Sequence, residues 1–351
     1  MSWKRAPERI RLKEGGYLIS RRLLVAAAAC AVTIAGCGRG TPDASDAPQR
    51  TRVGLVAKSL GNGFFDAVHK GADEAAKELD AEVIFTGPTT PTAEGQIEVL
   101  NALIAQRVDA IAVSANDPDA LVPTLKKALD RGIKVVSYDS AVDPAGRIAH
   151  LAPSSDQLIG ETVVALAAEL SPQGQGKFAV VSATPTSTNQ NSWLAQMRNA
   201  LSRHPGLEMV SVVYGDDVSD KSYRETVALL KQHPDLAVVV SISSVGIVAT
   251  ARAVQDLGLA GKVKVTGLGL PSELAGYVRS GVVPKFAIWN PIDLGYATTQ
   301  IATRLARGAN IGAPVPTGRM GEVVFAADGV GAMSKPFIYD ASNVGEFEKV
   351  F

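Results

Sequence analysis

The sequence predicts an α/β protein of two similar lobes, each a doubly wound parallel sheet, with a ligand cleft between them. From residue 52 onward, short apolar runs typical of buried strands alternate with amphipathic helical segments. The same alternating unit occurs twice along the chain. Polar side chains follow these apolar runs, at the strand ends where open α/β sheets bind ligands. These three observations together favour two facing α/β lobes.

Residues 1–36 have the pattern of a lipoprotein signal peptide and are excluded from the predicted fold. A basic segment precedes the apolar residues 23–34, which are too few to span a bilayer. The segment runs into Ile34-Ala35-Gly36-Cys37, which resembles a bacterial lipobox, so we expect cleavage before Cys37 and acylation of its sulfur. Residues 37–50, which are polar, would then be a flexible tether. The Arg21-Arg22 pair keeps twin-arginine export open beside the general secretory route.

Charge and cysteine content exclude several classes of function. The 351-residue chain carries 35 basic and 35 acidic side chains, so its formal net charge is zero, and no basic run follows the leader. This balance argues against a nucleic-acid partner. Of the two cysteines, Cys30 lies in the removed signal and Cys37 would carry lipid. The mature chain therefore has no thiol for a disulfide, a thiolate metal site or a cysteine nucleophile.

The first lobe is predicted to begin with a strand at residues 52–57 and a loop that contains Gly61 and Gly63. A helix follows from about Phe64. The remaining elements are expected as strands at residues 82–86, 110–114 and 134–138 and as helices at residues 92–106 and 119–131.

A second series of the same kind follows the first. It is expected to contain strands at residues 177–182, 208–214, 237–241 and 262–267 and helices at residues 156–170, 192–203, 222–232 and 245–257. An extended stretch at residues 281–289 and a helix at residues 294–307 come after this second lobe is complete. We therefore expect the chain to cross back between the lobes.

Polar and aromatic side chains lie just beyond the predicted strands, at the expected rim of the cleft. They are hydroxyls, amides, one ammonium, one well-placed carboxylate and an aromatic ring, contributed by Lys58, Asn62, Ser114, Asp139, Asn189, Gln190, Asn191, Ser243, Ser244 and Trp289. Carboxylates and amides bind vicinal hydroxyls, and aromatic rings cover the C–H faces of a sugar. The set therefore fits a small neutral polyol. A phosphate site would need several arginines or a glycine-rich helix start, and these positions supply neither.

Ordinary structural roles explain some of these residues equally well. Residues 189–191 could cap the helix that follows them, and Lys58 could be a solvated charge or form a salt bridge with Asp139. Asp139 has no following helix to cap, which favours a role in binding. Phe64 and Phe65 are adjacent in a helix and point about 100° apart, so we expect one of them to line the cavity.

The sequence lacks the arrangements typical of an enzyme. Its four histidines stand at helix ends, on a helix and on a strand, without a shared cluster. We find no Ser-His-Asp order, nucleophile elbow or His-Glu-x-x-His pair, and no His, Cys and carboxylate set with metal-ligand spacing. We therefore expect a binding protein with no cofactor and no bound metal.

Several stretches carry a resemblance to a known family. They are VAKSLGNGFFDAVHKGA, TGPTTPTAEGQ, VSANDPDAL, GDDVSDKSYRE, VTGLGLPSELAGYV, FAIWNPIDLGYA and PFIYDASNV. Through them, the chain from about residue 52 to its end resembles the periplasmic sugar-binding proteins of bacterial ABC importers, of the ribose and galactose type. Within that family it is most similar to the rhamnose-binding receptors, which are related to autoinducer-2 receptors.

The resemblance implies a type I periplasmic binding protein fold, with three crossings between the lobes near Pro153, Pro291 and Gly318. Ligand binding would close the lobes. The implied ranges are 51–153 and 291–318 for the N-terminal lobe, and 154–290 and 319–351 for the C-terminal lobe.

The resemblance also implies ligand contacts. They fall on Lys58, Asn62, Phe64, Phe65 and Asp139 in the first lobe and on Asn189, Gln190, Asn191 and Trp289 in the second. Autoinducer-2 receptors have an acid where this chain has Asn189, and a Pro and an Ala where it has Ile242 and Ser244. An amide and an apolar wall suit a sugar with one methyl group among its hydroxyls. The expected ligand is therefore L-rhamnose.

The expected function is that of an extracytoplasmic lipoprotein that captures L-rhamnose and delivers it to the permease and ATPase subunits of an ABC importer. The alternative is a receptor for autoinducer-2 or another sugar, in import or in sensing. We expect a monomer attached to the cell membrane by its lipid, in the periplasm or on the outer face. A transcription repressor of the same fold would have a helix-turn-helix where this chain has a lipobox leader.

Overall fold

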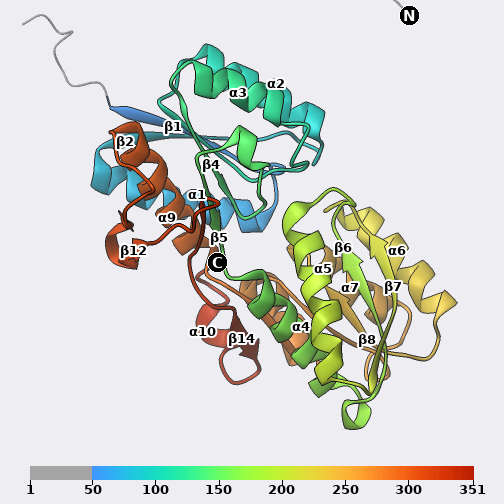
Figure 1. The fold of residues 1–351 in the computed structure, drawn as a ribbon. Coiled ribbons are helices and arrows are strands. Elements are labelled where there is room, and N and C mark those ends of the chain that lie inside the picture. The colour runs from blue at the N-terminus through green and yellow to red at the C-terminus, as the bar shows by residue number, and fades with distance from the viewer. Residues whose placement is uncertain (1–49) are drawn as a thin grey trace, which may run out of the picture. The chain divides into compact units, whose positions relative to one another are not determined.

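The computed structural model describes residues 50–351, which belong to one compact unit. The predicted signal peptide, Cys37 and the tether up to residue 49 lie outside the described residues. Two separate parallel sheets form the cores of two lobes (Figure 1). Within residues 50–351, no helix combines the length and the apolar character needed to cross a membrane.

The first lobe contains a six-stranded sheet in which every pairing is parallel. In spatial order its strands are β13 (Val330–Ala332), β5 (Ala149–Ala152), β4 (Lys134–Tyr138), β3 (Ala110–Val113), β1 (Thr51–Val56) and β2 (Ala81–Thr86). In register, Val53 pairs with Ala110 on one side and with Val83 on the other. β1 and β3 are interior strands covered on both faces, which is why they read as continuous apolar runs.

Helices cover both faces of the first sheet (Figure 1). α2 (Ala93–Ala105) and α3 (Val122–Asp130) pack on one face, and α1 (Gly63–Leu79) and α9 (Pro291–Ala306) pack on the other. Successive side chains of β3 point to opposite faces of the sheet and so divide the core into two parts. Ile111 packs in the apolar cluster under α2 and α3, whereas Ala112 packs in the cluster with α1 and α9.

The crossing of α1 and α9 depends on two glycines. A Cβ at Gly71 would lie 1.8 Å from the carbonyl oxygen of Ile292, and a Cβ at Gly295 would lie 1.8 Å from that of Val68. These distances are far inside van der Waals contact, so the two backbones can approach this closely only at glycine. The returning helix α9 is thereby packed tightly onto the first lobe.

The second lobe contains a four-stranded parallel sheet flanked by helices. Its spatial order is β7 (Leu207–Tyr214), β6 (Gly176–Ser182), β8 (Leu236–Ser241) and β9 (Lys264–Gly267). The helices are α4 (Asp156–Leu170), α5 (Thr188–Ala200), α6 (Ser219–Gln232), α7 (Ser244–Asp256), α8 (Pro271–Arg279) and the short α10 (Val344–Phe347). An antiparallel pair, β10 (Lys285–Ile288) and β14 (Phe337–Asp340), extends this sheet through a bridge between Leu268 and Ala287.

These two sheets confirm the predicted α/β fold of two doubly wound lobes. Several helices begin three or four residues from their predicted starts, and the difference at α5 bears on the site. α5 begins at Thr188, so residues 189–191 lie inside its first turn instead of before it. The helix α8 was not predicted from the sequence, where Pro271 at its first position reads as a breaker although proline is well tolerated there.

The prediction that the chain finally leaves the first lobe near Gly318 is wrong. Gly318 begins a 3₁₀ turn between two short strands, β11 (Val315–Pro316) and β12 (Glu322–Val323), which pair with each other. The chain then forms β13, which pairs with β5 in the first sheet, and reaches the second lobe only at β14. A three-residue strand beside glycines is too short to give a recognisable apolar pattern.

Candidate ligand-binding site

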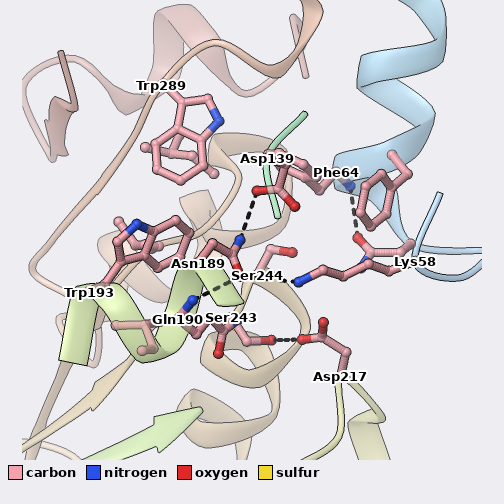
Figure 2. A pocket seen from close by; sticks show the side chains of 15 residues that line it. Lys58, Phe64, Asp139, Asn189, Gln190, Trp193, Asp217, Ser243, Ser244 and Trp289 are labelled. Atoms are coloured by element: carbon pink, nitrogen blue, oxygen red, sulfur yellow. Dashed lines mark hydrogen bonds between the residues drawn. The ribbon is translucent and has the colours of Figure 1, made fainter. Parts of the chain in front are cut away.

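Side chains from both lobes line one pocket (Figure 2). The space among them is about 400 Å³, its open mouth included. The lining residues are Lys58, Asn62, Phe64, Phe65 and Asp139 from the first lobe and Asn189, Gln190, Trp193, Asp217, Ile242, Ser243, Ser244, Leu268, Ile288 and Trp289 from the second.

The loop after β1 positions Lys58 and Asn62. Asn62 is the N-cap of α1, and its Oδ1 accepts a hydrogen bond from the backbone N–H of Phe64 at 3.0 Å. That bond satisfies one of the N–H groups that a helix start leaves unpaired. Nδ2 of Asn116 donates to the carbonyl oxygen of Lys58 at 2.8 Å and fixes the loop from behind. The Lys58 side chain is thereby held in the pocket with only 3% of its surface exposed.

Asp139 follows β4 and is a buried carboxylate of the first lobe. Its φ of 56° is uncommon for a residue other than glycine, although aspartate tolerates it better than most. Its Oδ2 accepts from Oγ of Ser114 at 2.7 Å, and its Oδ1 accepts from Nδ2 of Asn189 at 3.0 Å. Burial raises the pKa of Asp139; Lys58 and the bond from Ser114 oppose that rise, and Asp217 adds to it.

Asn189 connects the two lobes across the pocket (Figure 2). While its Nδ2 donates to Asp139, its Oδ1 accepts from Nζ of Lys58 at 3.2 Å and from the backbone N–H of Gln190 at 2.8 Å. The first turn of α5 has N–H groups without helical partners, and Asn189 pairs with one of them. Asn189 is thus a polar group of the cleft that also pairs with a first-turn N–H, although Ser187 and not Asn189 is the N-cap residue of α5.

Gln190 contributes an amide to the second-lobe wall. Its Oε1 accepts from Oγ of Ser182 at 2.7 Å and from the backbone N–H of Ala183 at 2.6 Å. In the part of the chain that the structure describes, its Nε2 has no hydrogen-bond partner. Since Gln190 lines the pocket, this amide can offer a donor to a ligand.

Aromatic rings from both lobes meet in the pocket. The Phe64 ring lies edge-on to Phe65 at 5.2 Å and to Trp289 at 6.1 Å between centroids, and Trp289 lies 5.6 Å from Trp193. Nε1 of Trp193 donates to Asp156 at 3.0 Å, which fixes the orientation of that ring. The buried Nε1 of Trp289 has no hydrogen-bond partner within residues 50–351. Both phenylalanines line the pocket, in keeping with the family resemblance, whereas the geometry of the helix alone led us to expect one of them there.

The site geometry can be set beside known proteins. The sequence profile described as periplasmic binding protein domain matches residues 53–310. The chain belongs to this family. A D-ribose/D-allose-binding protein of Pseudomonas aeruginosa is 32% identical over 260 residues, which cover 71% of this chain and 79% of the relative.

Two solved structures resemble this periplasmic binding protein over most of its length. An ABC transporter solute-binding protein from Clostridium phytofermentas with bound L-rhamnose has 34% identity and a TM-score of 0.82, and the match covers 86% of this chain and 99% of that one. LsrB from Clostridium saccharobutylicum, in complex with AI-2, has 22% identity and a TM-score of 0.80, with 84% and 99% covered. At that identity, LsrB shares the fold. The relatives named here are solute-binding proteins and not enzymes.

Two residues predicted for the site of this periplasmic binding protein do not line the pocket. Ser114 is fully buried and reaches the pocket only through its bond to Asp139. Asn191 is exposed, and its Nδ2 donates to the carbonyl oxygen of Pro185 at 2.7 Å. Successive residues of a helix point about 100° apart, so Asn191 turns away when its two predecessors face the pocket. The alternative salt bridge from Lys58 to Asp139 is not formed in the described part of the chain, because Lys58 bonds to Asn189.

Sequence reasoning missed four lining residues, which are Trp193, Asp217, Leu268 and Ile288. Trp193 lies one helical turn after Asn189 on α5, so the helical spacing was a signal for it. Asp217 lies just beyond the end of β7, after Asp216. It therefore meets the criterion by which the other residues were chosen, that polar side chains just beyond the strand ends lie at the cleft. We call this criterion the strand-end rule. Within residues 50–351, no three His, Cys, Asp or Glu side chains gather into a group that could hold a metal ion.

Proposed function

We propose that this protein is an extracytoplasmic receptor that captures a monosaccharide, L-rhamnose, between its lobes and delivers it to an ABC importer. The observation that carries the proposal is the hydrogen-bonded chain from Lys58 through Asn189 to Asp139, which crosses a pocket lined with aromatic rings. All three side chains are buried. A buried polar group left unpaired costs about 1–3 kcal/mol, so a ligand must offer replacement partners when it enters.

Sugar hydroxyls meet this requirement because each can donate and accept a hydrogen bond. A hydroxyl pair can replace Asn189 as the partner of the Lys58 ammonium and the Asp139 carboxylate. The Phe64 and Trp289 rings can cover the C–H face of the sugar. Contacts then come from both lobes, and the ligand favours the closed arrangement by its greater affinity for that state.

An apolar part of the pocket supports a 6-deoxy sugar. Ile242, Leu268 and Ile288 line it beside the aromatic rings, and each is at most 3% exposed. A methyl group placed there would contribute about 1 kcal/mol by burial. A hydroxyl at the same position would lack a partner, which would cost about 1–3 kcal/mol. The structure with 34% identity that contains L-rhamnose supports the same choice.

The proposal extends to how the protein is attached and to its partners. We propose a monomer anchored through an acylated Cys37, in the periplasm or on the outer face of the cell membrane, and docked by the permease and ATPase subunits of an importer. The lipobox around Cys37 supports the anchor. A receptor for another sugar, in import or in sensing, is the second candidate, because the relative from Pseudomonas aeruginosa is named for D-ribose and D-allose.

Isothermal titration calorimetry of the mature protein tests the proposal. The panel is L-rhamnose, its 6-hydroxy analogue L-mannose, D-ribose, D-allose and autoinducer-2. We expect L-rhamnose to bind at least about tenfold more tightly than L-mannose, from the burial and hydroxyl terms above. Tight binding of autoinducer-2 or D-ribose with no heat from L-rhamnose would overturn the rhamnose assignment. Absence of binding by every sugar in the panel would overturn the receptor proposal.

A further inference from the structure

A second carboxylate lines the pocket from the lobe opposite Asp139. This carboxylate belongs to Asp217, which lines the pocket. β7 is followed by a turn that contains Asp216 and Asp217, and their φ values are 54° and 51°. Two consecutive residues other than glycine with positive φ are uncommon, and the surrounding structure must hold them there. Asp216 is turned to the outside of the pocket, where its carboxylate pairs with Nζ of Lys221 at 2.5 Å. The turn therefore directs one of two adjacent acids into the cleft.

Ser243 fixes the orientation of Asp217. Its Oγ donates to Oδ1 of Asp217 at 2.5 Å and accepts from the backbone N–H of Gly246 at 3.0 Å as the N-cap of α7. A hydroxyl has one hydrogen to donate, and the cap uses only a lone pair, so the carboxylate receives that hydrogen. Among residues 50–351, Oδ2 of Asp217 has no hydrogen-bond partner. One oxygen is thus anchored while the other is available to a ligand.

Asp217 and Asp139 influence each other across the cleft. Burial is the main cause of the raised pKa of Asp139, and the charge of Asp217 contributes to the same rise. The Lys58 ammonium is drawn between the two carboxylates in Figure 2. The residues that line the pocket carry two acids, Asp139 and Asp217, and one base, Lys58, so the ionised site has one negative charge in excess.

We propose that Asp217 is a direct ligand contact of the second lobe, and that with Asp139 it makes the pocket select uncharged polyols over sugar acids. Oδ2 of Asp217 accepts a ligand hydroxyl hydrogen, since an ionised carboxylate offers only acceptors. An anionic ligand would enter a desolvated site with excess negative charge, where like charges repel more strongly than in water. This inference rests on the proposed function and assigns to it a residue and a class of ligand.

Calorimetry with L-rhamnose on three proteins tests the contact. Asp217→Asn keeps the size of the side chain and an acceptor for Ser243 but loses the charge. We expect it to bind L-rhamnose about tenfold to a hundredfold more weakly, the usual effect of losing a hydrogen bond to a charged group. Asp216→Asn is the matched control on the same turn, and it should bind as the wild type does because its partner Lys221 is outside the pocket.

Two further measurements complete the test. Carbon-detected NMR titration of the Asp139 carboxyl should show its pKa lowered in Asp217→Asn and unchanged in Asp216→Asn. D-galacturonate at millimolar concentration should not displace L-rhamnose from the wild-type protein. Equal affinity of Asp217→Asn and wild type overturns the contact, and an unchanged Asp139 pKa or displacement by D-galacturonate overturns the charge selection. If the wild type binds no neutral sugar of the panel, both the proposed function and this inference are wrong.

Discussion

Replacing Asp139 with alanine should weaken ligand binding by one to two decades. Of its two hydrogen bonds, the 2.7 Å bond from Ser114 holds the carboxylate, and the 3.0 Å bond from Asn189 is the one that a ligand would take over. A hydrogen bond to a charged group contributes about 1.5–3 kcal/mol. At about 1.4 kcal/mol per tenfold change in affinity, Asp139→Ala should raise Kd by roughly tenfold to a hundredfold.

The assay is calorimetry with L-rhamnose, accompanied by thermal unfolding. Asp139→Ala also unpairs the buried Ser114 hydroxyl, which should cost about 1–3 kcal/mol of stability, so a loss of binding could reflect poor folding. Asp139→Asn is the control for poor folding, because asparagine tolerates the positive φ and can still accept a hydrogen bond from Ser114. Ser114→Ala separates the two effects, since it removes the same bond and keeps the carboxylate. A folded Asp139→Ala protein with wild-type affinity would show that Asp139 does not contact the ligand.

Three other predictions concern the anchor, the helix crossing and pH. Metabolic labelling with a fatty acid should tag the protein, and Cys37→Ala should abolish the tag; a tag that persists in the variant contradicts the anchor. Gly71→Ala should destabilise the protein by about 1–3 kcal/mol or more in thermal melts, because the added Cβ would overlap the backbone of Ile292. The control is Gly276→Ala in α8, whose added Cβ would have no atom within 4 Å, so this variant should be neutral or stabilising. Burial raises the pKa of Glu273 from 4.5 to about 7, with Asp66 adding to the rise. The folded state therefore binds this proton more tightly, stability should fall as pH rises from 4.5 toward 7, and Glu273→Gln should flatten that part of the profile; an unchanged slope in the variant would assign the pH dependence to another group.

The strand-end rule predicted much of the site because parallel strands bring their carboxyl ends to one edge of a sheet. It correctly brought Lys58, Asp139 and Ser244 to the pocket although they are far apart in sequence. It failed at Asn191, where the outcome depends on the residue at which α5 begins. A shift of the helix start by a few residues changes which side chains face the cleft, and sequence signals locate helix ends only approximately.

Other features could not be read from the sequence for different reasons. Whether Asp216 or Asp217 enters the pocket is decided by two positive φ angles and by a bond from Ser243, which lies on a distant loop. The bridge of Asn189 to Lys58 and Asp139 depends on contacts between lobes that no local pattern encodes. The strand β13 has three residues, and only its pairing with β5 identifies it.

The packing of Trp193 against Trp289 has a practical consequence. The chain has three tryptophans, and the remaining one, Trp3, lies in the segment expected to be removed on export. All indole emission from the mature protein would therefore come from the two rings that line the ligand pocket. Because one ring packs on Phe64 of the opposite lobe, separating the lobes would change the surroundings of Trp289. Unlabelled mature protein should thus report sugar entry and lobe closure optically, without a dye or an engineered probe.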